Sequence, residues 1–337
     1  MKRSITLNIL IVLIFFSVIP QLRAQPIPDI SSYSQTIKLS CLKSANDKNL
    51  FLLSKLDLNR SLLDTIRPAK DDKIPVEKKN RFHPVRFAVV TGGLVTAWLG
   101  MHIYYSNTWW KDRAHYFKYA EDPYYARDID KLSHIYTANL ISVSSAKFYE
   151  WSGLNPTLAL VVGSSTAIAY ETYIEINDGL SPNWGFDWGD MAGNFIGALF
   201  PIAQHFVKPL RSFNIKWSFE PSWINRKLRN YPDLLDDYTS MKFWLTVSPY
   251  DLLPKKVQRY YPAFLGFGVG FNLQNASHAT GATNAFKEYY LAFDIDVTKL
   301  PGKTEFLKKM KEVLNFYHIP MPGIKVYKNT VWYGLLF

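Results

Sequence analysis

The stretch WGFDWGDMAGNFIGALFPIAQHFV, residues 184–207, decides the predicted fold because it joins acidic side chains to a long apolar run. From Met191 onward it is almost wholly apolar, which predicts a helix packed among other helices. Asp187, Asp190 and Asn194 are spaced three and four residues apart and therefore share one face of that helix. Burying a neutral polar group without a partner costs on the order of 2 to 7 kcal/mol, and a charge costs more. We therefore expect these side chains to meet polar partners on neighbouring helices.

Three apolar segments precede this one and complete a predicted bundle of about four helices. The first, Val85–Tyr105, is about 20 residues long, enough to cross a bilayer, and the sequence leaves open whether it does so. Its Gly92, Gly93 and Gly100 are expected to let another helix approach closely. The other three segments, of about 12 to 17 residues, are too short to be read separately as membrane spans. They are Ile135–Ala146, Thr157–Tyr170 and Met191–Val207, with turns at 153–156 and 178–182.

The C-terminal third has a different pattern. Apolar residues alternate with polar residues or glycine over Phe264–Leu273 and over Glu288–Val297, and a period of two marks strands. Lys303–Tyr317 has helical spacing instead, and Ile324–Leu336 predicts a hairpin that turns at Lys328 and Asn329. We count four or five strands, fewer than the eight of the smallest transmembrane barrel. The predicted fold class is α+β: an apolar helical bundle followed by a small antiparallel sheet with one helix.

The N-terminus has the three parts of a secretory signal peptide: a basic start, an apolar run and small residues before Gln25. The run of roughly 15 residues is short of the ~20 that a spanning helix needs, so we expect cleavage after Ala24. The only cysteine, Cys41, lies far from that point, which argues against direct lipidation, and a single cysteine can form no internal disulfide. The predicted organisation is a signal peptide at 1–24, a poorly ordered arm or linker at 25–84, the helical bundle at 85–212 and the sheet with its helix at 213–337.

The amino-acid composition indicates which classes of binding partner to expect. The net charge is +11 and 16% of the residues are aromatic. In an exported protein the charge suits anionic lipid headgroups or acidic envelope polymers, or is simply that of a basic, solvated surface. With the aromatic content, we expect a membrane lipid surface or another envelope protein as partner. No nucleic-acid-binding motif accompanies the charge, so no nucleic acid is expected. We predict an exported protein in the periplasm or associated with the outer membrane, and embedding of the bundle in the inner membrane stays open.

Three pairs or triplets of polar residues within the predicted helical bundle form the candidate site. If the helix faces that carry them meet, one imidazole and several carboxylates converge, as in metal or acid/base sites of helical bundles. A divalent metal is the one cofactor considered, with His134, Glu171 and Asp190 as candidate ligands. His134 is alternatively a general base oriented by Asp130. The candidate site residues are Asp130, His134, Glu171, Glu175, Asp187, Asp190 and Asn194.

Each of these residues also has a structural interpretation. Lys131 is expected to pair with a carboxylate, Asp187 to cap the helix that begins near Trp188, and Asn194 to satisfy a backbone group. We read Asp178-Gly179 as a turn in which Gly179 has a positive backbone dihedral. No phosphate-binding glycine loop, serine nucleophile elbow or zinc-binding His-Glu helix occurs.

Taken in order, Asp130–His134, Glu171–Ser181 and Trp184–Gly197 resemble the YfiM-like group of predicted periplasmic lipoproteins of unknown function. The order Asp-Lys-x-x-His, a helical Glu and Asp-x-x-x-Asn-x-x-Gly is also distantly similar to the VanZ-like membrane proteins. The resemblance covers about Val85–Pro209 and implies a small helical envelope module. No cysteine follows the cleavage site, which departs from the lipoprotein pattern. The sheet looks like the extension of longer Bacteroidetes-type relatives. The positions that match the motifs are Asp130, Lys131, His134, Glu171, Asp187, Asp190 and Asn194.

Two functions follow from these patterns. The first is a membrane-associated scaffold or interaction module, favoured by the signal peptide, the aromatic content and the lack of a recognised catalytic pattern. The second is a protein that binds or processes an envelope lipid or glycan through the buried His and carboxylate cluster. The sequence leaves open whether the protein is an enzyme. The two functions differ in whether His134 and the carboxylates line one accessible pocket.

Overall fold

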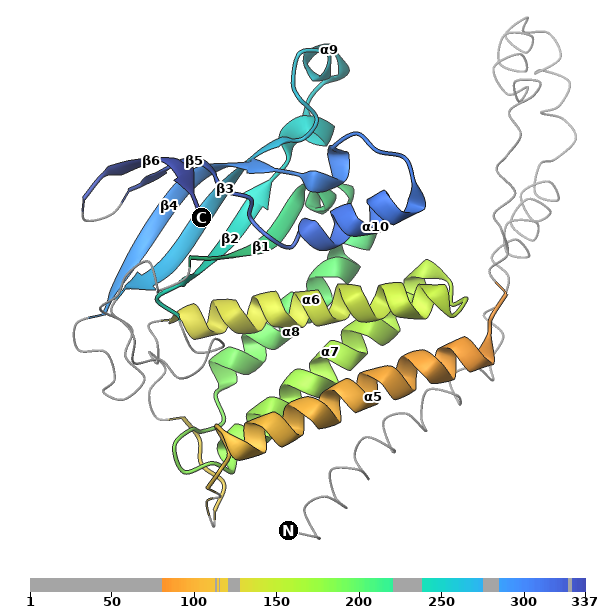
Figure 1. Cartoon of the computed structure of the whole chain (residues 1–337), viewed down its shortest axis with the longest axis vertical. Helices are drawn as coiled ribbons and strands as arrows, with labels where there is room; N and C mark the ends of the chain where they lie inside the picture. The colour runs from red at the N-terminus through yellow and green to blue at the C-terminus, as the bar shows by residue number, and fades with distance from the viewer. Residues whose placement is uncertain are drawn as a thin grey trace, which may run out of the picture. The chain divides into compact units, whose positions relative to one another are not determined.

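The computed structural model describes residues 81–120 apart from 113 and 115, and residues 128–220, 238–274, 285–326 and 329–337. The predicted signal peptide, Cys41 and the predicted arm up to residue 80 lie outside these residues, as does Lys328 of the predicted turn. The described chain has four long helices followed by a six-stranded antiparallel sheet and a further helix (Figure 1). The predicted α+β class is therefore confirmed.

The four long helices contain the predicted apolar segments, except that the last helix ends one residue before Val207. They extend beyond the predicted segments because polar residues continue them at their ends. Two have proline in the first turn, where a missing N–H costs nothing. The Asn155 side chain caps α7 by accepting a hydrogen bond from the Leu158 N–H. The helices are α5 (Pro84–Asn107), α6 (Ile129–Trp151), α7 (Pro156–Gly179) and α8 (Trp188–Phe206).

Small residues fill the contact between α6, α7 and α8. A Cβ at Gly163 would lie 2.5 Å from the Ser142 carbonyl oxygen, and one at Gly197 would lie 2.1 Å from that of Ile135. The Ser142 hydroxyl lies 2.9 Å from that of Ser164, which joins α6 to α7 by a buried hydrogen bond. Small residues thus let the backbones of these helices approach closely, and a hydroxyl bridge joins two of them.

The close approach predicted for the glycines of α5 is wrong. No described atom lies within 4 Å of a Cβ placed at Gly92, Gly93 or Gly100. The positive dihedral predicted at Gly179 is wrong as well, since the described glycines with positive φ include Gly153, at 92°, and not Gly179. Gly179 ends α7, where a Cβ would lie 2.5 Å from the Phe117 ring, so the small residue makes room for an aromatic side chain.

Among the described residues, α5 is the one helix long and apolar enough to cross a membrane, judged by length and composition alone. Its outward side chains are exposed, with Val85 at 73% and Ile103 at 64%. The inner side of α5 contacts the bundle along the helix, through Phe87 and Leu94 in the first half, Trp98 against Tyr170 in the middle and Tyr105 near the end.

The sheet is a meander in which each strand pairs with the next in antiparallel fashion. Strands β3 and β4 match the predicted alternating segments, and β5 and β6 form the predicted hairpin. The first two strands were not predicted, although Phe213, Ile215, Trp217 and Phe219 alternate along β1. The strands are β1 (Phe213–Phe219), β2 (Met241–Val247), β3 (Leu265–Gln274), β4 (Phe286–Ile295), β5 (Met321–Lys325) and β6 (Val331–Leu336); the remaining helices are α9 (Lys255–Gln258), α10 (Glu305–Leu314) and 3-10 turns at Lys208–Ser212, Pro249–Leu252 and Val297–Lys299.

Helix α6 packs directly on the sheet. Ile129 of α6 is buried against Met241, Phe243 and Leu273 of the strands. In Figure 1, α6 accordingly lies between the sheet and the other helices. The N-terminal end of α6 is therefore enclosed on several sides, and this end carries Asp130.

Candidate functional site

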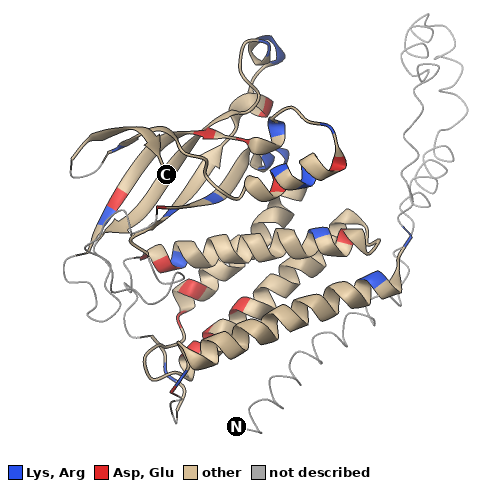
Figure 2. Cartoon of the chain, viewed as in Figure 1, with Lys and Arg blue, Asp and Glu red and all other residues tan. Residues whose placement is uncertain are grey.

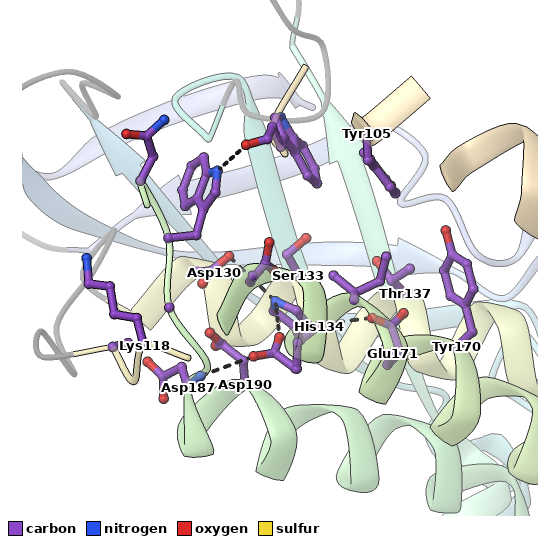
Figure 3. Close-up of a pocket in the computed structure, with 18 of the residues that line it drawn as sticks. Tyr105, Lys118, Asp130, Ser133, His134, Thr137, Tyr170, Glu171, Asp187 and Asp190 are labelled. Carbon is purple, nitrogen blue, oxygen red and sulfur yellow. Dashed lines mark hydrogen bonds and ion pairs between the residues drawn. The ribbon is translucent and has the colours of Figure 1, made fainter. Parts of the chain in front are cut away.

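The predicted site residues come together at one end of the bundle. Asp130 and His134 belong to α6, Glu171 and Glu175 to α7, and the other three to the start of α8. Together with aromatic residues, six of the seven line a cavity of about 370 Å³ (Figure 3), while Asn194 lies beside His134. The six are Asp130, His134, Glu171, Glu175, Asp187 and Asp190.

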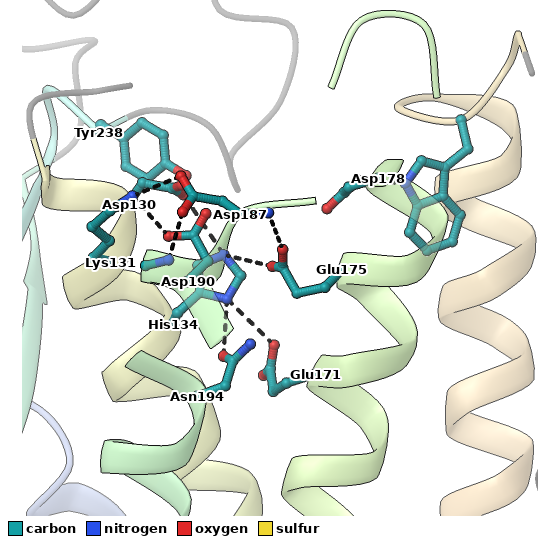
Figure 4. A network of polar contacts seen from close by, with 12 residues as sticks. Asp130, Lys131, His134, Glu171, Glu175, Asp178, Asp187, Asp190, Asn194 and Tyr238 are labelled. Atoms are coloured by element: carbon teal, nitrogen blue, oxygen red, sulfur yellow. Dashed lines mark hydrogen bonds and ion pairs between the residues drawn. The ribbon is translucent and has the colours of Figure 1, made fainter. Parts of the chain in front are cut away.

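His134 is the centre of the cluster (Figure 4). Its Nδ1 lies 3.0 Å from Asn194 Oδ1 and 3.6 Å from Glu171 Oε2. Its Nε2 lies 3.6 Å from Glu175 Oε1 and 3.9 Å from Asp130 Oδ1. Burial alone disfavours the charged ring, but contact with Glu171 and the nearby Asp130 and Asp190 carboxylates outweigh it, so the pKa of His134 lies well above its usual value.

Lys131 and Asp187 have the structural roles predicted for them. The Asp187 carboxylate accepts a 2.6 Å hydrogen bond from the Gly189 N–H and so caps α8. Lys131 Nζ lies 3.1 Å from Asp187 Oδ2 and 3.2 Å from Asp190 Oδ1. Burial opposes the lysine charge, yet Asp190 and Asp187 outweigh it and raise the pKa of Lys131. This ion-paired triad fixes the start of α8 beside α6.

Two carboxyl groups have strongly raised pKa values. Burial raises the pKa of Glu175 to about 9, even though His134 and the Asp187 N–H lower it. Burial and then the charge of Asp130 raise the pKa of Asp190 to about 7, against the lowering effect of His134 and Lys131. Perturbed carboxyl groups of this kind are common where a cavity binds cations or exchanges protons.

Tyr238 is a member of the cluster that sequence reasoning missed. Its hydroxyl donates a 2.6 Å hydrogen bond to Asp130 Oδ1. It lies just before β2, in a segment with no periodic pattern, and it reaches Asp130 only because the sheet folds back over α6. The cavity wall also includes Tyr105, Trp109 and Trp184, which no spacing rule connects to the cluster.

One carboxylate oxygen of the cluster is unpaired within the described part of the chain. Glu171 is 3% exposed, and its Oε1 has no hydrogen-bond partner among the described residues, while Oε2 faces His134. Buried polar atoms are nearly always paired, and an unpaired one costs roughly 1–3 kcal/mol. Glu171 therefore contributes a buried carboxylate oxygen that no described residue satisfies.

Residues 119–205 match the model of a family described as predicted periplasmic lipoprotein (DUF2279). The matched segment contains all seven candidate residues. No curated protein and no solved structure matches the chain. The match supports a periplasmic lipoprotein family of unknown function and with it an exported, envelope-associated location. Likeness to the VanZ-like proteins and to a Bacteroidetes-type long form stays a prediction from the motifs.

Proposed function

We propose that this chain is a membrane-associated envelope protein that binds the polar headgroup of a lipid in the His134 pocket. The observation that carries the proposal is the convergence of titratable side chains from three helices on one cavity, where Glu171 Oε1 has no partner among the described residues. A purely structural cluster has its polar atoms paired with one another. Processing of the lipid, rather than binding alone, would use the same groups.

The surface of the bundle supports a lipid partner. Figure 2 shows helices α5 to α8 with few charged residues along their lengths, and these gather near the helix ends. Large apolar side chains on the outer faces are exposed, including Val89 and Ile103 of α5 and Ile196 of α8, each by more than half. Extended apolar surface of this kind marks membrane or protein contacts.

The surroundings of the pocket support a location at headgroup depth. Tyr105 and Trp109, where α5 ends, line the cavity together with Trp184. The Tyr105 and Trp109 rings stack with centroids 4.5 Å apart. Trp and Tyr are enriched where the apolar core of a membrane meets water. The pocket thus combines an aromatic wall with a charged floor, which suits a molecule with an apolar and a polar part.

Lipid binding can be tested separately from membrane partition by using a soluble short-chain lipid. The full chain, purified in mild detergent, is titrated with dihexanoyl phosphatidylethanolamine or phosphatidylglycerol and its melting temperature is followed. We expect the lipid to raise the melting temperature of the wild type and of Glu288→Gln, a control carboxylate 5% exposed in the sheet. Glu171→Gln should fold and lose the effect.

An equal rise in melting temperature for the wild type and for folded Glu171→Gln would instead assign the cluster a structural role. A response to a peptidoglycan disaccharide in place of lipid would move the function to glycan binding.

A second candidate function, a scaffold or interaction module, is favoured by the sheet. A groove of about 450 Å³ lies on the same sheet face that packs against α6, and it is lined almost wholly by apolar side chains, among them Leu245, Phe267 and Trp332. Leu245 and Trp332 are more than half exposed. Charge introduced by Val269→Lys in this groove should leave lipid binding at the His134 pocket unchanged and abolish co-purification of a protein partner.

A further inference from the structure

We propose that the His134 pocket holds a divalent metal ion, with Asp130, His134 and Asp190 as its ligands and Glu175 beside them. The inference rests on the proposed function only in treating the pocket as a ligand site, and it names a bound group that would mediate headgroup recognition. An acidic cavity repels the phosphate of a lipid headgroup, and a metal ion would reverse that repulsion.

The separations among the three residues fit a metal site. One ligand atom from each of Asp130, His134 and Asp190 lies within 4.8 Å of the others. His134 Nε2 lies 3.9 Å from Asp130 Oδ1 and 3.6 Å from Glu175 Oε1. A metal at about 2.0–2.2 Å from nitrogen and oxygen ligands places neighbouring donor atoms roughly 3–3.5 Å apart. Small side-chain rotations would therefore close the site.

The groups behind the ligands hold them in the required orientation. Asn194 Oδ1 can accept the Nδ1–H of His134, which directs Nε2 toward the carboxylates. The Tyr238 hydroxyl donates to Asp130 Oδ1 and fixes that carboxylate in the same way. Outer hydrogen bonds of this kind are typical of metal-binding His and Asp residues. Figure 4 shows His134 placed between these partners.

Glu171 provides an independent observation. The Glu171 side chain is only 3% exposed and points toward His134. Its Oε1 has no partner among the described residues. A free carboxylate oxygen in a cavity that already holds several carboxylates is costly unless a cation is bound there. The Oε2 of Glu171 lies 3.6 Å from Nδ1 of His134, the ring nitrogen on the far side from the ligand atom Nε2, so this carboxylate would reach the ion through a bound water molecule and not directly.

The charge balance and the donor types select the class of ion. The cavity is lined by Asp130, Glu171, Glu175, Asp178, Asp187 and Asp190, against Lys118 and His134 in its wall and Lys131 beside it. Lys131 already neutralises Asp187 and part of Asp190. Oxygen donors with a single imidazole suit Mn²⁺, Fe²⁺ or Zn²⁺ better than the all-oxygen, larger shell of Ca²⁺.

The test is metal binding by the full chain in mild detergent after treatment with EDTA. The protein is dialysed separately against Zn²⁺ and Mn²⁺, and its metal content is measured by mass spectrometry and its affinity by calorimetry. We expect about one ion per chain for the wild type and for the control Glu288→Gln. His134→Gln and Asp190→Asn should weaken binding at least about tenfold, the scale seen for changes in metal surroundings. X-ray absorption of the zinc form should show one imidazole among oxygen ligands.

Metal binding that is equal in the wild type and in Asp190→Asn, or a stoichiometry near zero, would overturn the proposal. If Asp190→Asn does not fold, Tyr238→Phe provides a second variant, because it keeps every ligand and should still weaken the affinity. If the wild type binds no metal but its melting temperature still rises with short-chain lipid, the metal proposal is wrong and the lipid-binding proposal stands. If the wild type neither binds metal nor gains thermal stability from the lipid, the proposal that the His134 pocket is a ligand site is wrong.

Discussion

His318 should make the protein less stable as the pH falls below neutrality. The side chain is fully buried and stacks on Trp244, with ring centroids 4.0 Å apart and an angle of 8° between the planes. Its Nε2 lies 3.2 Å from the Phe293 carbonyl oxygen, to which a neutral ring donates. Burial lowers the pKa of His318 to about 4, although the carboxylate of Asp294 raises it. The folded state thus keeps this ring neutral in a range where the unfolded chain protonates it.

The sign and the size follow from linkage. A histidine whose folded pKa lies below its unfolded pKa of about 6.5 contributes its full stability above pH 6.5 and loses it as the pH falls toward 4. Each pH unit within that window is worth about 1.4 kcal/mol. Between pH 7 and pH 5 the expected loss from His318 is therefore about 2 kcal/mol.

Urea unfolding at pH 7 and at pH 5, with detergent held constant, measures this loss. His318→Phe keeps the stacking on Trp244 and removes the titration, so the difference between the wild type and this variant isolates the His318 contribution from that of the carboxylates. The wild type should lose about 2 kcal/mol more than the variant over this range. An equal loss in both proteins would refute the reasoning.

Three further predictions concern packing, capping and membrane contact. Gly197→Ala should destabilise the protein by about 1–3 kcal/mol, because the added Cβ would clash with the Ile135 carbonyl oxygen. The control Gly92→Ala, where no described atom lies near the added Cβ, should stabilise α5 by about 0.5–1 kcal/mol. Thermal unfolding of the two variants distinguishes these effects. Asp187→Ala should cost about 1–2 kcal/mol in urea unfolding, since it removes the α8 cap and an ion-pair partner. Ile103→Asp, on the exposed side of α5, should reduce flotation of the protein with phospholipid vesicles without lowering its melting temperature; unchanged flotation would place the membrane contact elsewhere.

The periodicity of apolar and polar residues predicted most of the fold and most of the site residues. It could not predict contacts between residues that are far apart in the sequence. Spacings of three and four residues identify Asp130 with His134 and Asp187 with Asp190, because one helix turn suffices to bring such residues together. Tyr238 reaches Asp130 through the return of the sheet over α6, which no local pattern encodes. The glycines of α5 led to a wrong packing prediction, because a small residue permits close approach without causing it.

The distribution of roles within the cluster argues that it does more than hold the helices together. Lys131 and Asp187 already fasten α6 to α8, and hydroxyl bridges fasten α6 to α7. The bundle would keep these links without His134 and Glu171, and replacing buried charges by apolar groups of similar size is often neutral or stabilising. His134 and Glu171 instead lie in a cavity, with one carboxylate oxygen unpaired among the described residues. Buried ionisable side chains in a cavity wall lower the stability of the fold, and apolar residues of similar size would pack there as well. Such side chains are expected where a ligand binds.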